Sequence, residues 1–390
     1  MNKHNFDIVV DRRNTNSVKY DCCYQLGKKE GLLPLWVADM DFKTAPEIIQ
    51  ALMQRAEHGV YGYTDLKDNY FDAVIEWMER QHQWVIKKQW ILVTPGVVYA
   101  IASAIRNLTN KGDHILIQPP VYYPFFSTVI NNERKLVHNP LCYKEGRYEI
   151  DFEDFERKII QYDVKLFILC NPHNPVGRVW TKEELTRLGD ICLKHGVIVV
   201  SDEIHQDFIH EGYEHTVFAN LKKEYESITI TCTSPSKTFN LATLQVANIV
   251  ISNNEYKKKM LTDLLAQGQD NINAFGLEAC IAAYTKSDQW LKELKAYLKG
   301  NIDYVRKFLH EELPQLKLVE PEGLYLLWID FSALGLSDKE LDQLITQKAK
   351  LWLSAGLTFG KEGSGFQRIN IACPRSVVQQ ALEQLKAAID

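Results

Sequence analysis

Between about residues 90 and 252, short apolar runs alternate with amphipathic stretches, and this alternation restricts the possible folds more than any other feature of the sequence. Such alternation is typical of βαβ units, which form a mainly parallel sheet. The apolar runs that predict strands are WILVT, HILIQP, VKLFILC, VIVVSDE, SITITC and VANIVIS. In open α/β sheets, ligands bind beyond the carboxyl ends of the strands, so a site is expected in the loops that follow these runs.

Two stretches between these runs predict helices, namely GVVYAIASAIRNLT and TKEELTRLGDICLKHG. In the second, Thr181 followed by Glu184 fits a capping box, in which the two residues satisfy the free backbone groups at a helix start. Gly196 fits the left-handed residue that commonly ends a helix. We therefore expect this helix to have well-defined ends.

After about residue 254 the pattern becomes helical, with apolar residues spaced by three and four. A long helix is expected around residues 289–313, followed by the strand candidates GLYLLWIDF and FQRINIAC and two more helices. The predicted architecture is α/β, with a large mainly parallel-sheet domain and a smaller α+β domain. We expect an N-terminal arm at 1–45 that contributes to the small domain, a large domain at 46–285 and a small C-terminal domain at 286–390.

Length and composition exclude several classes of protein. A chain of 390 residues can bury one large core and one smaller core. With a net charge of -5 and no long basic block, we expect no nucleic-acid partner. No run of about 18 apolar residues predicts a membrane span, and the first residues lack the apolar core of a signal peptide. The eight cysteines form no paired C-x-x-C units, so no metal site is expected. These features predict a cytoplasmic protein.

Four loops that follow predicted strands carry residues suited to chemistry. NPHNPVG, with two Asn-Pro pairs and a glycine, forces a tight turn that can aim Asn174 outward. SDEIH places Asp202 at the end of an apolar strand, and SPSK places Lys237 just beyond another. TPGVVYA opens a helix whose first backbone N–H groups can bind an anion.

A lysine, an acid, an amide and an anion cradle at one sheet edge suit a phosphorylated heteroaromatic cofactor with a reactive aldehyde. Pyridoxal phosphate needs a lysine for its Schiff base and a carboxylate that keeps its pyridine nitrogen protonated. The sequence therefore predicts a pyridoxal-phosphate site.

The order N-P-x-N-P-x-G, then D-E, then S-x-S-K resembles the fold type I pyridoxal-phosphate enzymes of the aspartate aminotransferase superfamily. The resemblance covers nearly the whole chain, since VYGYT precedes these motifs and GFQRINIACPRS follows them. It implies an aspartate-aminotransferase-like fold and a homodimer with its sites at the subunit interface.

The resemblance also implies a role for each matching residue. Lys237 would form the Schiff base and shuttle protons, Asp202 would pair with the pyridine nitrogen, and Asn174 would donate to the phenolic oxygen. Tyr122 would stack on the ring and help to move protons. Arg368 would bind the α-carboxylate of the substrate by the bidentate pairing that arginine favours.

The same resemblance implies a phosphate site made of backbone and hydroxyl groups. Val97 and Val98 would contribute backbone N–H groups, and Ser234 and Ser236 would contribute hydroxyls. Tyr63 would reach this site from the second subunit.

Two departures from the aminotransferase pattern narrow the choice of branch within this superfamily. His205 stands where these enzymes usually have tyrosine, and Gln245 stands where they usually have arginine, so the phosphate site lacks one charge. DEIH, NPHNPVGRVW, VADMDF and CPRS resemble the cystathionine β-lyase branch typified by MalY and PatB, which includes the cystalysins. This implies β-elimination of cysteine thioethers such as L-cystathionine, and of L-cysteine, to pyruvate, ammonia and a thiol or sulfide.

Alternatives remain open at this stage. One alternative is an aminotransferase of the same fold, which would share every cofactor residue. The other is a regulatory binding protein, because the resemblance to MalY-like proteins also implies the ability to hold a transcription factor through a surface patch. His205 is either a cofactor contact or a satisfied structural histidine, and Trp36 lines the substrate entrance or anchors a core or interface. Lys237 and Arg368 could be surface residues, and Tyr63 could serve in packing.

Overall fold

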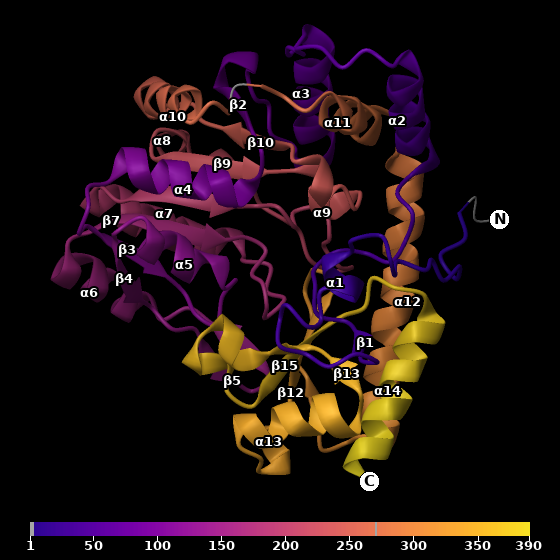
Figure 1. Ribbon diagram of the computed structural model, residues 1–390. Helices are drawn as coiled ribbons and strands as arrows, with labels where there is room; N and C mark the ends of the chain where they lie inside the picture. Colours follow the sequence, from indigo (N-terminus) through magenta and orange to yellow (C-terminus); the bar gives the residue numbers. More distant parts are fainter. Residues whose placement is uncertain (1–3, 270) are drawn as a thin grey trace.

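The computed structural model describes residues 4–269 and 271–390, which form two lobes. The 25-residue helix α12 (Asp288–Glu312) runs along both lobes and joins them (Figure 1). It begins close to the predicted start, and its apolar residues at three- and four-residue spacing are buried against the largest core cluster.

The large lobe is built on a seven-stranded sheet with the order β2-β10-β9-β8-β7-β3-β4. β10 runs antiparallel to both of its neighbours, and the other pairs are parallel. The mainly parallel sheet that the alternation predicts is thus confirmed, and all six predicted runs form strands. The strands are β2 (Ile91–Thr94), β3 (His114–Ile117), β4 (Lys135–His138), β7 (Val164–Cys170), β8 (Ile198–Asp202), β9 (Thr229–Thr233) and β10 (Ala247–Val250).

Helices cover both faces of this sheet, as continuous apolar strands require. In β7, Leu166 and Ile168 belong to the core cluster under α4, α5 and α10, whereas Phe167 and Leu169 belong to the cluster under α6 and α7. These helices are α4 (Val97–Leu108), α5 (Pro124–Asn131), α6 (Phe152–Tyr162), α7 (Lys182–His195) and α10 (Asn254–Ala266).

The ends of α7 are as predicted. Thr181 and Glu184 form the capping box, and Gly196 ends the helix with a φ of 66°.

The small lobe contains the four-stranded antiparallel sheet β11-β12-β15-β14, which packs with α14 (Arg375–Ile389) and α12. Its strands are β11 (Lys317–Leu318), β12 (Leu326–Asp330), β14 (Ser354–Ala355) and β15 (Phe366–Asn370). The predicted helix at 338–350 is shorter than expected, because α13 (Asp338–Gln343) passes into a π-helical turn at Leu344–Lys348.

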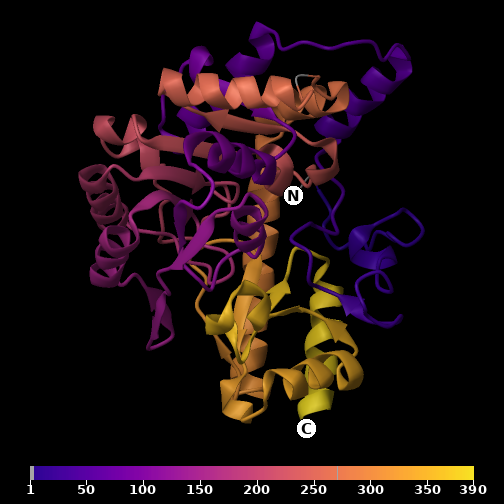
Figure 2. The same ribbon diagram turned by 60° about the vertical axis from the view of Figure 1, so that its left-hand side comes forward.

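The N-terminal arm is attached to the small lobe. β1 (Leu33–Pro34) pairs in parallel with β13 (Leu351–Trp352), and the short helix α1 (Val18–Asp21) lies beside them (Figures 1 and 2). We propose the domain boundaries 45/46 and 285/286. The first falls where α2 begins at Pro46, and the second falls at the last residue of α11, Lys286, just before α12 begins at Asp288. Residues 1–3 of the expected arm lie outside the described residues.

The other elements complete the large lobe. They are α2 (Pro46–His58), α3 (Asp68–His82), the hairpin β5 (Cys142–Lys144) and β6 (Arg147–Glu149), α8 (Lys223–Glu226), α9 (Pro235–Thr238) and α11 (Ala274–Lys286). None of the helices in residues 4–269 and 271–390 combines the length and apolar character that a bilayer span requires.

Candidate active site

A cavity of about 370 Å³ lies beyond the carboxyl ends of β7, β8 and β9, where the sheet topology predicts a ligand site. Most of the predicted site residues meet in its wall. They are Val97, Val98, Tyr122, Asn174, Asp202, His205, Ser234, Ser236 and Lys237, joined by Gln245.

Lys237 reaches this cavity from α9, immediately after β9. Its Nζ donates a hydrogen bond to the carbonyl oxygen of Ala38 at 2.8 Å. Burial lowers the pKa of Lys237 to about 8, against the influence of Asp39 and Asp202, which raise it. A useful fraction of the amine is therefore unprotonated near neutral pH, as a nucleophile and base requires.

Asp202 ends β8 and is buried, with 5% of its surface exposed. Burial raises its pKa to about 7, although the backbone N–H of Ile204 and the charge of Lys237 act in the opposite direction. A buried carboxylate of this kind is stabilised by a cation that binds beside it.

Arg368 does not itself line the cavity, but it forms a buried pair with Asn174, which does. Arg368 Nη1 donates to Asn174 Oδ1 at 2.9 Å, and Nη2 donates to the carbonyl oxygen of Trp36 at 2.7 Å and to Ser354 Oγ at 3.2 Å. Its buried Nε has no hydrogen-bond partner within the described chain. Such a donor is costly to leave unpaired and is suited to a carboxylate ligand.

His205 and Tyr122 line the cavity as uncharged groups. Burial lowers the pKa of His205 far below its usual value, and Lys237 and Arg368 add to this effect. His205 Nδ1 is buried without a partner among residues 4–269 and 271–390, and the ring meets that of Tyr325 at 71°. Burial likewise raises the pKa of Tyr122, whose ring packs edge-on against Phe125.

The first backbone N–H groups of α4 face the other end of the cavity. Val97 and Val98 precede Ala100, whose N–H makes the first hydrogen bond back to Gly96, so the N–H groups of both valines are free for an anion. Gln245 is exposed in a left-handed conformation with a φ of 52°. Among the described residues that line the cavity, Lys237 is the sole lysine or arginine.

The two serines differ in what they offer to an anion. Ser234 Oγ donates to the carbonyl oxygen of Val246 at 2.7 Å and accepts from the backbone N–H of Ser236 at 3.1 Å. Its hydroxyl proton is thus already used inside the protein. The Ser236 hydroxyl makes no hydrogen bond to the described chain and lines the cavity.

Tyr63 does not line the cavity of its own chain. It lies between α2 and α3 with 97% of its surface exposed, next to Val60 and Tyr61, which are also exposed. Trp36 does not line the cavity either, because its ring stacks on Trp352 at a centroid distance of 4.4 Å.

Several residues that support the site were not predicted. Asp207 accepts a hydrogen bond from Thr238, the neighbour of Lys237, and pairs with His82 Nε2 at 2.9 Å. Likewise Glu203, the neighbour of Asp202, pairs with His215 Nε2 at 2.9 Å. The acids Glu203 and Asp207 flank His205 in SDEIHQD, but the sequence does not indicate which histidines would pair with them.

The groups in the cavity fit pyridoxal phosphate. Lys237 offers an amine, Asp202 a buried carboxylate that a protonated ring nitrogen would stabilise, and α4 a set of free N–H groups for a phosphate. Arg368 Nε and His205 Nδ1 are buried polar atoms that find no protein partner in the described part of the chain. Their presence together beside the cavity indicates a polar ligand rather than a packed core.

Comparisons with known proteins agree with this arrangement. The model of the family "Aminotransferase class I and II" matches residues 30–385. Cystathionine β-lyase PatB of Bacillus subtilis is 45% identical over 385 residues, which are 99% of this chain and 100% of PatB.

Two solved structures have nearly the same fold. A pyridoxal-phosphate-bound putative aminotransferase from Clostridium difficile is 49% identical with a TM-score of 0.97, over 99% of this chain and 100% of that one. Cystalysin from Treponema denticola, which contains pyridoxal 5'-phosphate, is 40% identical with a TM-score of 0.95, over 99% and 98% of the two chains. The chain belongs to the class I and II aminotransferase family of pyridoxal-phosphate enzymes, in the branch that contains PatB and cystalysin.

Proposed function

We propose that the protein is a pyridoxal-phosphate-dependent carbon–sulfur lyase, which converts cysteine thioethers such as L-cystathionine to pyruvate, ammonia and a thiol. The observation that carries this proposal is the meeting of Lys237, Asp202 and His205 in one cavity, in a chain that is 45% identical to PatB. L-Cysteine itself would give sulfide in place of the thiol.

Bound pyridoxal phosphate supplies an electron sink for the electron pair that remains on the substrate when its Cα proton is removed. Asp202 would hold the proton on the ring nitrogen, and the N–H groups of Val97 and Val98 and the hydroxyl of Ser236 would hold the phosphate. Asn174 uses its side-chain oxygen for Arg368, which leaves its NH₂ group for the phenolic oxygen.

Lys237 would take the Cα proton of the substrate. Its pKa of about 8 suits this step, because the amine must be free to accept a proton near neutral pH. Arg368 would bind the α-carboxylate and so orient the Cα–H bond. The Cβ–S bond then breaks, the electron pair leaves with the sulfur, and the thiolate takes up a proton. The remaining aminoacrylate is hydrolysed by water to pyruvate and ammonia.

His205 and Gln245 support elimination over amino transfer, because both replace residues of the aminotransferase pattern. His205 is neutral and places no charge beside the ring, and Gln245 places none beside the phosphate. An aminotransferase is the second candidate, since the similar Clostridium difficile protein bears that name.

A product assay distinguishes the two reactions. Given L-cystathionine and no keto acid, a lyase releases pyruvate far beyond one equivalent per active site, because elimination regenerates the starting form of the enzyme in each cycle. Turnover that needs an added 2-oxo acid, with that acid recovered in aminated form, would instead establish a transaminase. L-Alanine, which has no leaving group on Cβ, is the matched control substrate.

We further propose a homodimer in which Tyr63 contacts the cofactor phosphate of the partner subunit. Supporting this, Val60, Tyr61 and Tyr63 are all exposed within four residues of one loop, and such a group of large apolar side chains is unusual for a surface in contact with water. A hydroxyl from the partner would also compensate in part for the missing cation at Gln245.

We propose a cytoplasmic location and a small amino-acid substrate, with no nucleic-acid or membrane partner. All eight cysteines are free thiols, which is typical of proteins from reducing compartments.

A further inference from the structure

The backbone between Trp36 and Asp41, called here the 36–41 segment, touches the two cationic groups of the site through its carbonyl oxygens. Trp36 O accepts from Arg368 Nη2 at 2.7 Å, and Ala38 O accepts from Lys237 Nζ at 2.8 Å. Ala38 O also accepts from the hydroxyl of Tyr325 at 3.1 Å. Since the segment is neither helix nor strand, its own backbone does not fix these carbonyls in place.

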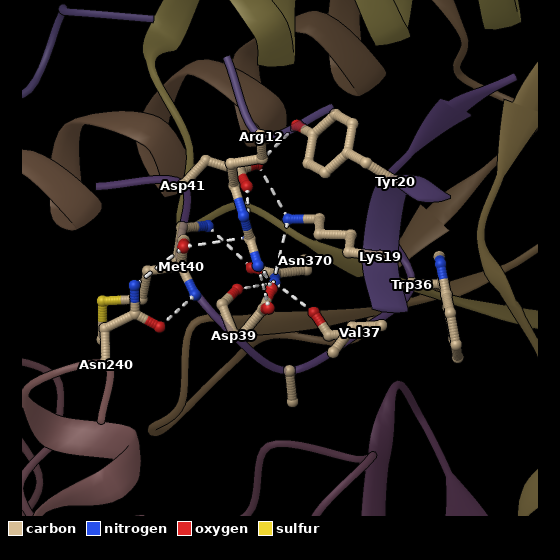
Figure 3. A network of polar contacts seen from close by, with 12 residues as sticks. Arg12, Lys19, Tyr20, Trp36, Val37, Asp39, Met40, Asp41, Asn240 and Asn370 are labelled. Carbon is tan, nitrogen blue, oxygen red and sulfur yellow. Dashed lines mark hydrogen bonds and ion pairs between the residues drawn. The ribbon is translucent and has the colours of Figure 1, made fainter. Parts of the chain in front are cut away.

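Two asparagines fix the segment by hydrogen bonds to its backbone (Figure 3). Asn370, two residues beyond Arg368 on β15, donates from Nδ2 to the carbonyl oxygens of Val37 and Asp39 at 2.5 and 2.6 Å. Asn240 donates to the carbonyl oxygen of Met40 at 2.9 Å and accepts from its N–H at 3.0 Å. The segment is thus tied to the small lobe through Asn370 and to the large lobe through Asn240.

The N-terminal arm adds the charged part of this network. Arg12 donates from Nη1 and Nη2 to the carboxylate of Asp39 at 3.1 and 2.5 Å, and from Nη1 to Asp41 Oδ1 at 2.7 Å (Figure 3). Lys19 Nζ pairs with Asp41 Oδ2 at 2.8 Å, and the hydroxyl of Tyr20 donates to the same oxygen. Two cations therefore balance two carboxylates in a largely buried cluster.

Arg12 holds a special position in this cluster, because it donates hydrogen bonds to both carboxylates and to the carbonyl oxygen of Met40 at 3.2 Å. Lys19 Nζ hydrogen-bonds to Asp41 and makes only a longer ion pair with Asp39, at 3.7 Å. A planar guanidinium can bridge several acceptors in a fixed geometry, which a single ammonium group cannot do. It also neutralises Asp39, whose negative charge raises the pKa of Lys237. Loss of Arg12 would therefore act on the geometry of the segment and on the charge near the site.

We propose that Arg12 is a positioning residue for the reaction, which acts through the 36–41 segment to hold Arg368 ready for the substrate carboxylate. Arg12 touches neither substrate nor cofactor and works through Asp39, Asp41 and the carbonyl oxygen of Trp36. The inference rests on the proposed function only in requiring that the substrate is an α-amino acid.

Glycine binding to the holoenzyme tests the inference separately from the lyase reaction, because glycine has the α-carboxylate but no Cβ from which a group could leave. We expect the glycine Kd, measured by cofactor absorbance, to rise at least tenfold in Arg12→Ala. Arg13→Ala is the matched control, since it removes the same charge one residue away at an exposed position, and its Kd should stay within twofold of wild type.

Arg12→Lys separates geometry from charge. It keeps the positive charge beside Asp39, so the pH midpoint of the cofactor absorbance should stay at the wild-type value, while glycine binding weakens. In Arg12→Ala the same midpoint should rise, because Asp39 then keeps only its longer ion pair with Lys19, at 3.7 Å, and leaves more negative charge near Lys237. If Arg12→Ala does not fold, Arg12→Lys alone decides.

A glycine Kd within twofold of wild type in Arg12→Lys and in any folded Arg12→Ala would overturn the inference. So would an equal loss of binding in Arg13→Ala. A wild-type enzyme that binds glycine but releases no thiol from L-cystathionine would refute the proposed function alone, since the effect of Arg12 on glycine would still be measured.

Discussion

Arg368 Nη1 in the small lobe donates a hydrogen bond to the side-chain oxygen of Asn174 in the large lobe, at 2.9 Å. The residue that is expected to bind the substrate carboxylate is thereby linked to the residue that is expected to bind the cofactor. This link fixes the two side chains relative to each other, so less ordering is needed when the substrate binds.

Replacing Arg368 should weaken the use of substrate more than the binding of cofactor. Removing one partner of a buried, charge-assisted pair costs about 3–5 kcal/mol, so kcat/KM of Arg368→Ala should fall by about two to four orders of magnitude. Steady-state kinetics give this value, and cofactor absorbance serves as the control. An Arg368→Ala enzyme that loses its cofactor but keeps substrate affinity would show that the arginine has another role. Arg368→Lys keeps the charge but loses the planar fork, so its kcat/KM should lie between those of the wild type and Arg368→Ala.

Lys237→Ala should prevent covalent attachment of the cofactor, since Lys237 is the sole lysine among the described residues that line the cavity. Borohydride treatment of the wild-type holoenzyme, followed by peptide mass spectrometry, should place the cofactor mass on the peptide with Lys237. The variant should carry no such mass on any peptide. A labelled lysine elsewhere in Lys237→Ala would refute the assignment.

Asp202 should make the stability of the cofactor-free protein depend on pH. Its pKa rises from 3.8 to about 7 on folding, so the folded state binds its proton more tightly than the unfolded state. Asp202 therefore contributes stability that is fully present below pH 3.8 and is lost as the pH rises through about 7.

Denaturant unfolding of the cofactor-free wild type and Asp202→Asn at several pH values measures this effect. The wild type should lose up to about 4 kcal/mol relative to the variant between pH 4 and pH 8, the amount that corresponds to the raised pKa. Parallel curves for the two proteins across this range would mean that Asp202 is not responsible.

Asp202→Asn should also retain cofactor while slowing turnover severely, because the ring nitrogen loses its charge partner.

Tyr63 allows a test of shared active sites. Mixing inactive Lys237→Ala with inactive Tyr63→Phe subunits should restore about a quarter of wild-type activity, since half of the dimers are hybrids and each hybrid has one intact site. The matched control mixes Lys237→Ala with Asp202→Asn. These two residues line the same cavity of one chain, so their hybrids should contain no intact site and remain inactive. If the subunits are shown to exchange but the first mixture recovers no activity, Tyr63 either serves the active site of its own chain or has no role in activity.

The sequence predicts the central sheet and most of the cavity wall because those features have local signals. Apolar runs identify the strands, and the turn residues around Asn174 and the loop of Lys237 follow them directly. β4 escaped prediction because KLVH is a short edge strand that begins with a charged residue, and edge strands lack the continuous apolar pattern of central ones.

The contacts of Arg368 and Lys237 with the 36–41 segment could not be predicted, because the segment makes them through its backbone. The carbonyl oxygens of Trp36 and Ala38 accept the hydrogen bonds of Arg368 and Lys237, and every residue type carries such a carbonyl. The placement of these carbonyl oxygens depends on Asn240 and Asn370, and no motif in the sequence marks these two asparagines as supports of the segment. The pairing of His82 with Asp207 is equally hidden, since it joins residues that only the tertiary fold brings together.

The pairing of β1 with β13 also sets an order for the assembly of the molecule during synthesis. Leu33 is made early but has no strand partner until Leu351 has been made. The strands β7, β8 and β9, which precede Asn174, end at Asp202 and precede Lys237, are complete long before that point. Closing so long a loop has an entropic cost that later contacts must offset. We therefore expect the nascent chain to form the sheet side of the cavity first and to leave it open toward the arm, so that the cofactor can enter before the 36–41 segment covers Lys237.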